Sequence, residues 1–264
     1  MPDPNKKEDE LAGTEQPFVE HLMELRDRLI KAVIAIGVVA AVLAVWPGPG
    51  ALYDLLAAPL VASLPAGATM IATSVISPFL VPLKILLMAA FMIALPVVLY
   101  QVWAFVAPGL YSHEKKLVMP LVISSTLLFL IGVAFCYYFV FGQVFKFIQS
   151  FAPKSITAAP DIEAYLGFAL SMFLAFGLAF EVPIAVVVLA RVGIVTVDKL
   201  KSFRGYFIVV AFVVAAIVTP PDVVSQLALA IPMCILYEVG IWAAQLFIKH
   251  TKAPEETEAE ASGN

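Results

Sequence analysis

The acidic side chains that could most readily carry a function lie in apolar or amphipathic segments. Glu181 lies inside an apolar stretch, residues 165–192. An ionised carboxylate at bilayer depth is costly unless it meets a cavity or a partner. Glu181 therefore predicts either a polar position inside a transport device or a carboxyl that is protonated or hydrogen-bonded within a helix bundle. The amphipathic segment 18–29 places Glu24 one helical turn before Arg28, and pairing within the helix is a sufficient explanation of that spacing.

The composition indicates which elements position these groups. The chain of 264 residues is 62% hydrophobic and 14% charged, with a mean hydropathy of +0.96. Several apolar runs exceed the roughly 20 residues that cross a bilayer as a helix, and the alternating strands of an outer-membrane barrel are absent. We predict an all-α membrane protein with six transmembrane helices, over residues 29–46, 78–106, 117–142, 165–192, 206–219 and 223–248.

The basic residues predict the orientation of these helices. Of the sixteen Lys and Arg residues, only Lys84, Lys146 and Lys154 fall on one side of the predicted membrane. The other thirteen fall on the opposite side, so the positive-inside rule predicts that both termini are cytoplasmic. Prolines within the spans, among them Pro183 and Pro232, predict kinked helices and a bent, concave bundle.

Polar residues also mark the outer ends of the predicted helices. Asp161 and Glu163 precede helix 165–192, where the helix dipole favours carboxylates. The sequence Thr219-Pro220-Pro221-Asp222 leaves almost no loop between the last two helices, and Asp222 can cap the final one. The helix before it rises only roughly 22–24 Å, which predicts a recess or a thinned bilayer.

Two further polar positions predict hydrogen bonds between helices. The amide of Gln226 requires a partner from another helix, and Ser124 and Ser125 predict hydrogen bonds between helices.

The chain divides into three parts by composition. Residues 1–17 form a polar N-terminus, residues 18–249 the six-helix domain, and residues 250–264 an acidic tail that we expect to be disordered. The start of the chain has neither a cleavable signal peptide nor a transit segment, which favours a bacterial plasma membrane. Cys136 and Cys234 both fall in predicted helices and are interpreted as packing residues.

Four motifs resemble one family in the same order along the chain. They are His-Leu-x-Glu-Leu-Arg-x-Arg-Leu at residues 21–29, Tyr-Gln-x-Trp-x-Phe-x-x-Pro-x-Leu-Tyr at 100–111 followed by His113 and Glu114, Phe-Glu-Val-Pro at 180–183, and Thr-Pro-Pro-Asp at 219–222. Together they are similar to TatC, the polytopic subunit of the twin-arginine protein translocase. The resemblance runs from about residue 18 to residue 249 and includes all six predicted spans.

The resemblance implies a receptor for signal peptides with consecutive arginines. Glu24 and Glu114 match the cytoplasmic carboxylates that receive the arginine pair, and Phe105 matches an aromatic residue of the same site. A planar guanidinium binds a carboxylate bidentately, more selectively than lysine does. Arg26 matches a position near that site, where a structural ion pair explains it equally well.

The resemblance further implies partners and an energy source. Glu181, Thr219, Asp222 and Gln226 match polar positions in the membrane or at its outer edge, some of which are linked to the docking of partner helices. The implied partners are small single-span subunits of the TatA and TatB types and membrane lipids, in a multi-copy hetero-oligomer that binds no nucleic acid. The implied activity is export of folded proteins, driven by the proton gradient.

Enzyme functions find little support in the sequence. It has neither a Gly-x-x-x-x-Gly-Lys-Ser/Thr loop nor a His-Glu-x-x-His motif, and the three histidines show no metal-ligand spacing. We therefore predict a non-enzyme without a metal or cofactor. The alternative is a proton-coupled transporter of small molecules with Glu181 as the coupling carboxylate, although the sequence shows no clear inverted repeat.

Overall fold

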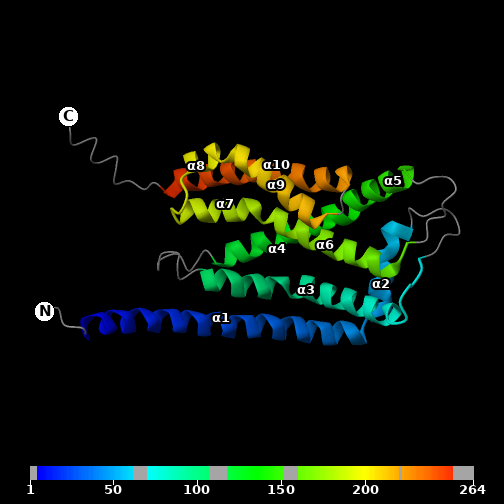
Figure 1. The fold of residues 1–264 in the computed structure, drawn as a ribbon, viewed down its shortest axis with the longest axis horizontal. Helices are drawn as coiled ribbons and strands as arrows, with labels where there is room; N and C mark the ends of the chain where they lie inside the picture. Colours follow the sequence, from blue (N-terminus) through cyan, green and yellow to red (C-terminus); the bar gives the residue numbers. More distant parts are fainter. Residues whose placement is uncertain (1–4, 62–69, 107–117, 152–159, 220–221, 252–264) are drawn as a thin grey trace. The chain divides into compact units, whose positions relative to one another are not determined.

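The computed structural model describes residues 5–61, 70–106, 118–151, 160–219 and 222–251 (Figure 1). Within these ranges the chain is helical, and its β pairing is limited to one isolated bridge between Ile71 and Asp161. The elements are α1 (Asn5–Val45), α2 (Pro49–Val61), α3 (Ser77–Val106), α4 (Val118–Phe135), the π-helical segment η3 (Cys136–Val140), α5 (Phe141–Phe151), α6 (Ile162–Phe180), α7 (Val182–Arg191), α8 (Val197–Ser202), α9 (Arg204–Val218) and α10 (Val223–Thr251).

Five segments of the described chain are long and apolar enough to cross a bilayer. They are His21–Val45, Ser77–Phe105, Val118–Phe147, Ile162–Arg191 and Val223–Leu246. Their 24 to 30 residues correspond to about 36–45 Å of helix, which exceeds a hydrocarbon core of about 30 Å. The apolar helix α9 has 15 residues and a rise of about 22 Å, so its predicted shortness is confirmed. The predicted all-helical class is confirmed with these five spans.

The chain forms two compact units, residues 1–48 with 86–123 and residues 49–85 with 124–264. The first unit holds α1 and most of α3. The apolar side chains of Val33, Ile34, Val38 and Val42 on α1 are about 60% exposed, as expected of a helix that faces lipid.

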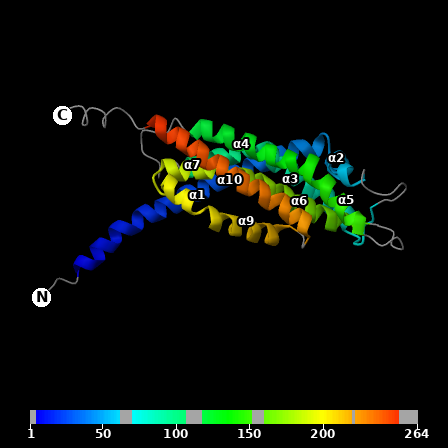
Figure 2. The same cartoon turned by 90° about the horizontal axis from the view of Figure 1, so that it is seen from above.

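The second unit is built around α10, which packs against α7 and lies beside α9 in both views (Figures 1 and 2). A Cβ atom added to Gly240 on α10 would lie 2.9 Å from Pro183 Cα, so only glycine allows this close approach. Gly132 on α4 has the same role, because an added Cβ would lie 2.5 Å from the Phe176 carbonyl oxygen on α6. Small residues at such crossings are typical of helix packing in membranes.

Two tyrosines attach α2 to the rest of the second unit by hydrogen bonds to its backbone. Pro59 has no N–H group, so the carbonyl of Leu55, four residues earlier, lacks its donor within the helix. The Tyr137 hydroxyl of η3 donates a hydrogen bond to that carbonyl at 2.7 Å. Nearby, the buried Tyr165 donates to the carbonyl of Leu56 at 3.0 Å. The two tyrosines therefore connect the surface helix α2 to η3 and α6.

Three of the predicted helices differ from the structure by more than a few residues. The helix predicted over residues 29–46 is only the C-terminal part of α1, which begins at Asn5. The helix predicted over residues 117–142 continues to Phe151, because α5 is amphipathic: Gln143 and Lys146 are exposed while Val144 and Phe145 are buried. The helix predicted over 165–192 is divided at Glu181 into α6 and α7.

Pro183 and Pro232, which predict kinks, lie at different places in their helices. The division at Glu181 agrees with the kink predicted at Pro183, which cannot donate to the carbonyl four residues earlier. Pro232 lies inside α10, which is helical on both sides of it, and the bend predicted there stays a prediction.

Candidate functional site

One candidate site joins α1 to the end of α3 within the first unit, and we term His21, Glu24, Arg28 and Phe105 the α1–α3 cluster. Helical spacing puts the three α1 side chains on one face. The Nε and Nη2 atoms of Arg28 donate to Glu24 Oε1 at 2.9 and 2.6 Å, which confirms the predicted pair. The His21 ring stacks on Phe105 with centroids 4.3 Å apart and planes 16° apart. His21 Nδ1 lies 3.9 Å from Glu24 Oε2.

The α1–α3 cluster has the properties of a cation-binding surface. The Glu24 side chain is 36% exposed, so a ligand can reach it from solution. The adjacent ring pair offers a flat surface, and a guanidinium can both stack on aromatic faces and bind a carboxylate. Arg26 instead donates to its neighbour Asp27 from Nε and Nη2, at 3.0 and 2.8 Å. The predicted site residue Glu114 lies outside the described residues, as does the helix break at residues 108–109.

Glu181 lies at the break between α6 and α7. It is the residue that ends α6 and precedes α7, and its carboxylate is hydrogen-bonded to the fully buried Ser125 of α4. This bond confirms the hydrogen bonding between helices predicted for Ser125. The Oε1 atom of Glu181 is buried and has no hydrogen-bond partner among the described residues. Glu181 is therefore half-buried and only partly satisfied, at a point where the helix itself is interrupted.

The turn between α9 and α10 gathers three of the predicted polar residues. Asp222 Oδ1 accepts a hydrogen bond from the Ser225 amide at 2.7 Å, so the predicted cap of the last helix is confirmed. The Gln226 amide Nε2 lies 3.4 Å from the Phe212 carbonyl of α9, and buried Thr219 donates to Ala215 at 2.8 Å. Asp222 Oδ2 and the Ser225 hydroxyl are buried without a partner among the described residues.

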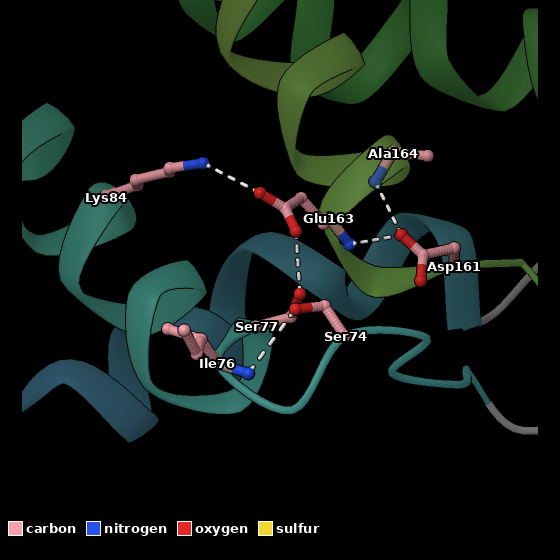
Figure 3. A network of polar contacts seen from close by, with 7 residues as sticks. All are labelled: Ser74, Ile76, Ser77, Lys84, Asp161, Glu163 and Ala164. Carbon is pink, nitrogen blue, oxygen red and sulfur yellow. Dashed lines mark hydrogen bonds and ion pairs between the residues drawn. The ribbon is translucent and has the colours of Figure 1, made fainter.

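A polar network holds the start of α6 against the segment that enters α3 (Figure 3). Asp161 caps α6 by accepting from the amides of Glu163 and Ala164, each at 2.9 Å. Its other oxygen accepts from the Thr73 amide and hydroxyl at 3.0 and 2.6 Å. These bonds, led by that of the Thr73 hydroxyl, lower the pKa of Asp161 to about 2. The network therefore keeps Asp161 ionised as the N-terminal cap of α6.

Glu163 continues this network toward α3. It accepts from the Ser77 hydroxyl at 2.6 Å and pairs with Lys84 at 3.1 Å (Figure 3). The helix-dipole effect predicted for Asp161 and Glu163 thus accompanies explicit hydrogen bonds to a second segment. A further ion pair links α9 to α10, where Arg204 Nε and Nη2 contact the two oxygens of Glu238, each at 2.7 Å.

The described helices define the class of this protein. They are those of an all-helical, multi-pass membrane protein whose polar clusters lie at span ends and at one interrupted span. Within the described residues, no group of three or more His, Cys, Asp or Glu side chains could hold a metal ion.

The comparisons with known proteins identify the family. The family model of the Sec-independent protein translocase protein TatC matches residues 20–232. The TatC proteins of Haemophilus influenzae and Escherichia coli are 48% and 47% identical to the chain, over 94% and 91% of it and 94% and 93% of their own lengths. A crystal structure described as the twin arginine translocase receptor TatC superposes with a TM-score of 0.74 at 41% identity, over 86% of this chain and 98% of that one. The chain belongs to the TatC family of protein translocase subunits.

The structure brings together some predicted site residues and adds others. It stacks His21 on Phe105 and places His21 Nδ1 3.9 Å from Glu24 Oε2, which adds to the site a residue that the sequence gave only as part of a motif. It gathers Thr219, Asp222 and Gln226 at one turn. The stacking of His21 on Phe105 could not be predicted, because it depends on how α1 and α3 are aligned along each other and the sequence alone does not give that alignment.

Proposed function

We propose that this protein is the receptor subunit of a twin-arginine translocase. In this proposal the α1–α3 cluster faces the cytoplasm and binds signal peptides with consecutive arginines through Glu24 and Phe105, with Arg26 near the site. Glu114 supplies a second carboxylate from the segment that follows α3. Together with single-span subunits of the TatA and TatB types, the protein exports folded proteins across the bacterial inner membrane, driven by the proton gradient.

One observation carries this proposal: Glu24 already binds a guanidinium. Arg28 donates two hydrogen bonds to the Glu24 carboxylate, and the His21–Phe105 ring pair lies at its edge. A carboxylate with this surrounding can accept an arginine side chain of a ligand, and charge-assisted hydrogen bonds of this kind contribute about 1.5–3 kcal/mol each.

The unsatisfied polar atoms in the membrane support a second part of the proposal, the docking of partner helices. Glu181 Oε1, Asp222 Oδ2 and the Ser225 hydroxyl are buried without a partner in the described chain. Polar side chains of a neighbouring helix can satisfy such atoms inside the membrane. We therefore assign Glu181 and the α9–α10 turn, with Thr219 and Gln226, to contacts with the single-span subunits.

The topology completes the proposal. We propose that α9 is a sixth, short span, that both termini are cytoplasmic, and that the spans form a bent, concave bundle. Residues 1–17 and 250–264 are then the cytoplasmic ends of a transmembrane domain over residues 18–249. The helices α1 and α10 extend beyond the bilayer on the cytoplasmic side, because α1 begins at Asn5 and α10 ends at Thr251.

The second candidate function is a proton-coupled transporter of small molecules. The observation that favours it is the interrupted span at Glu181, because broken helices form the substrate sites of many secondary transporters. Membership in a protein translocase family favours the first proposal.

Deletion of the gene in its host separates the two functions. The translocase proposal predicts that a folded fluorescent reporter with an Arg-Arg signal stays in the cytoplasm after deletion, and that the intact gene restores its export. A reporter whose signal carries Lys-Lys should remain inside in both strains. Unchanged export of the Arg-Arg reporter in the deletion strain would exclude the translocase proposal.

A further inference from the structure

We propose that Arg28 is an internal occupant of the Glu24 carboxylate, so that ligand binding exchanges one guanidinium for another. This inference rests on the function proposed above and adds a residue to its site. In the free receptor Arg28 holds the carboxylate. A signal-peptide arginine displaces it, and Arg28 returns when the peptide leaves.

The geometry of the contact distinguishes it from a permanent ion pair. Arg28 directs both Nε and Nη2 to the same oxygen of Glu24, Oε1, at 2.9 and 2.6 Å. The Arg204–Glu238 pair of the same protein is instead bidentate, because each oxygen of the carboxylate accepts from a different nitrogen of the guanidinium. At Glu24 the second oxygen lies 3.9 Å from His21 Nδ1, which is beyond hydrogen-bond distance. An incoming arginine can therefore approach Oε2 before Arg28 has left Oε1.

The surroundings of the pair also suit an exchange. The two partners lie one turn apart on α1, so Arg28 can swing away without any movement of the helix backbone. Their side chains are 36% and 23% exposed, so water and ligand reach both. Ion pairs at this helical spacing are weak, and the loss of one corresponds to a change of about twofold in an equilibrium constant. Arg28 therefore lowers the affinity of the receptor for the signal peptide slightly and does not prevent binding.

The test measures binding of a synthetic, fluorescein-labelled peptide with two consecutive arginines to the purified full-length protein in detergent, by fluorescence anisotropy. Arg28→Gln should tighten binding about twofold, because it frees Glu24. Arg28→Lys should tighten binding less, because an ammonium keeps the charge but cannot reproduce the two-donor contact. In a Glu24→Gln background, Arg28→Gln should give no tightening.

Lys31→Gln is the matched control, because Lys31 is exposed on the same helix and its loss removes the same charge. Tightening equal to that of Arg28→Gln would reduce the effect to general electrostatics and overturn the inference. Weaker or unchanged binding in both Arg28 variants, with weaker binding in Glu24→Gln, would also overturn it while leaving the proposed function intact. If Glu24→Gln binds the peptide as tightly as the unaltered protein does, Glu24 does not belong to the site. That result would refute both the exchange by Arg28 and the binding role proposed for Glu24.

Discussion

The contact between Tyr137 and the Leu55 carbonyl gives a quantitative test of how α2 is held. The carbonyl lacks a helical donor because residue 59 is proline, and the Tyr137 hydroxyl replaces that donor at 2.7 Å. Tyr137→Phe removes the hydroxyl and keeps the ring, so the loss is one hydrogen bond to a partly exposed acceptor. We expect the free energy of unfolding to fall by about 1 kcal/mol.

A double-mutant cycle isolates this contact from general effects on the ring. Pro59→Ala restores an N–H group that can donate to Leu55 within α2, so Tyr137→Phe should cost less than half as much in that background. The free energy of unfolding can be measured by titration with dodecyl sulfate in mixed micelles. Tyr138→Phe is the control, since the adjacent Tyr138 is 82% exposed and should change little. An equal cost of Tyr137→Phe in both backgrounds would refute the replacement of the missing donor.

Three further predictions follow from other parts of the chain. Gly240→Ala should lower the free energy of unfolding by about 1–3 kcal/mol, because the added Cβ would lie 2.9 Å from Pro183 Cα; unaltered stability would contradict the close approach. The ordinary pKa of 3.8 falls to about 2 in folded Asp161, so its stabilising contribution is full above pH 4 and is lost between about pH 4 and 2; thermal unfolding of Asp161→Asn should lack that pH dependence, and an identical profile would argue against the network. Glu181→Gln should insert and assemble normally, whereas Glu181→Leu should reduce export of an Arg-Arg reporter more than peptide binding; full export by the Leu variant would return Glu181 to a structural role.

The sequence predicted the elements of this protein better than their interruptions. Apolar runs of bilayer length identify spans directly, and Asp222 was recognisable as a cap from its place after two prolines. The continuation of α4 through η3 into α5 was missed, because Gln143 and Lys146 lower the local hydropathy although they lie on the exposed face. Hydropathy averages over all faces of a helix, whereas burial depends on one face.

The candidate site was predictable in its members and not in its contacts. Helical spacing gave the Glu24–Arg28 pair, because both residues belong to one element. The stacking of His21 on Phe105 depends on two helices far apart in sequence, and no local pattern reports their register. The network of Lys84 with Glu163 was missed for the same reason.

Photocrosslinking from the α1–α3 cluster tests the central claim most directly. With p-benzoylphenylalanine in place of Phe105, a labelled Arg-Arg signal peptide should crosslink to the protein in membranes, and an excess of unlabelled Arg-Arg peptide should prevent it. The same probe at the exposed Tyr138 serves as the control and should give no crosslink. Glu24→Gln should reduce the yield at Phe105 roughly tenfold, in proportion to the lost charge-assisted bonds. Absence of a crosslink at Phe105, or an equal yield from Tyr138, would contradict the receptor site proposed on α1 and α3.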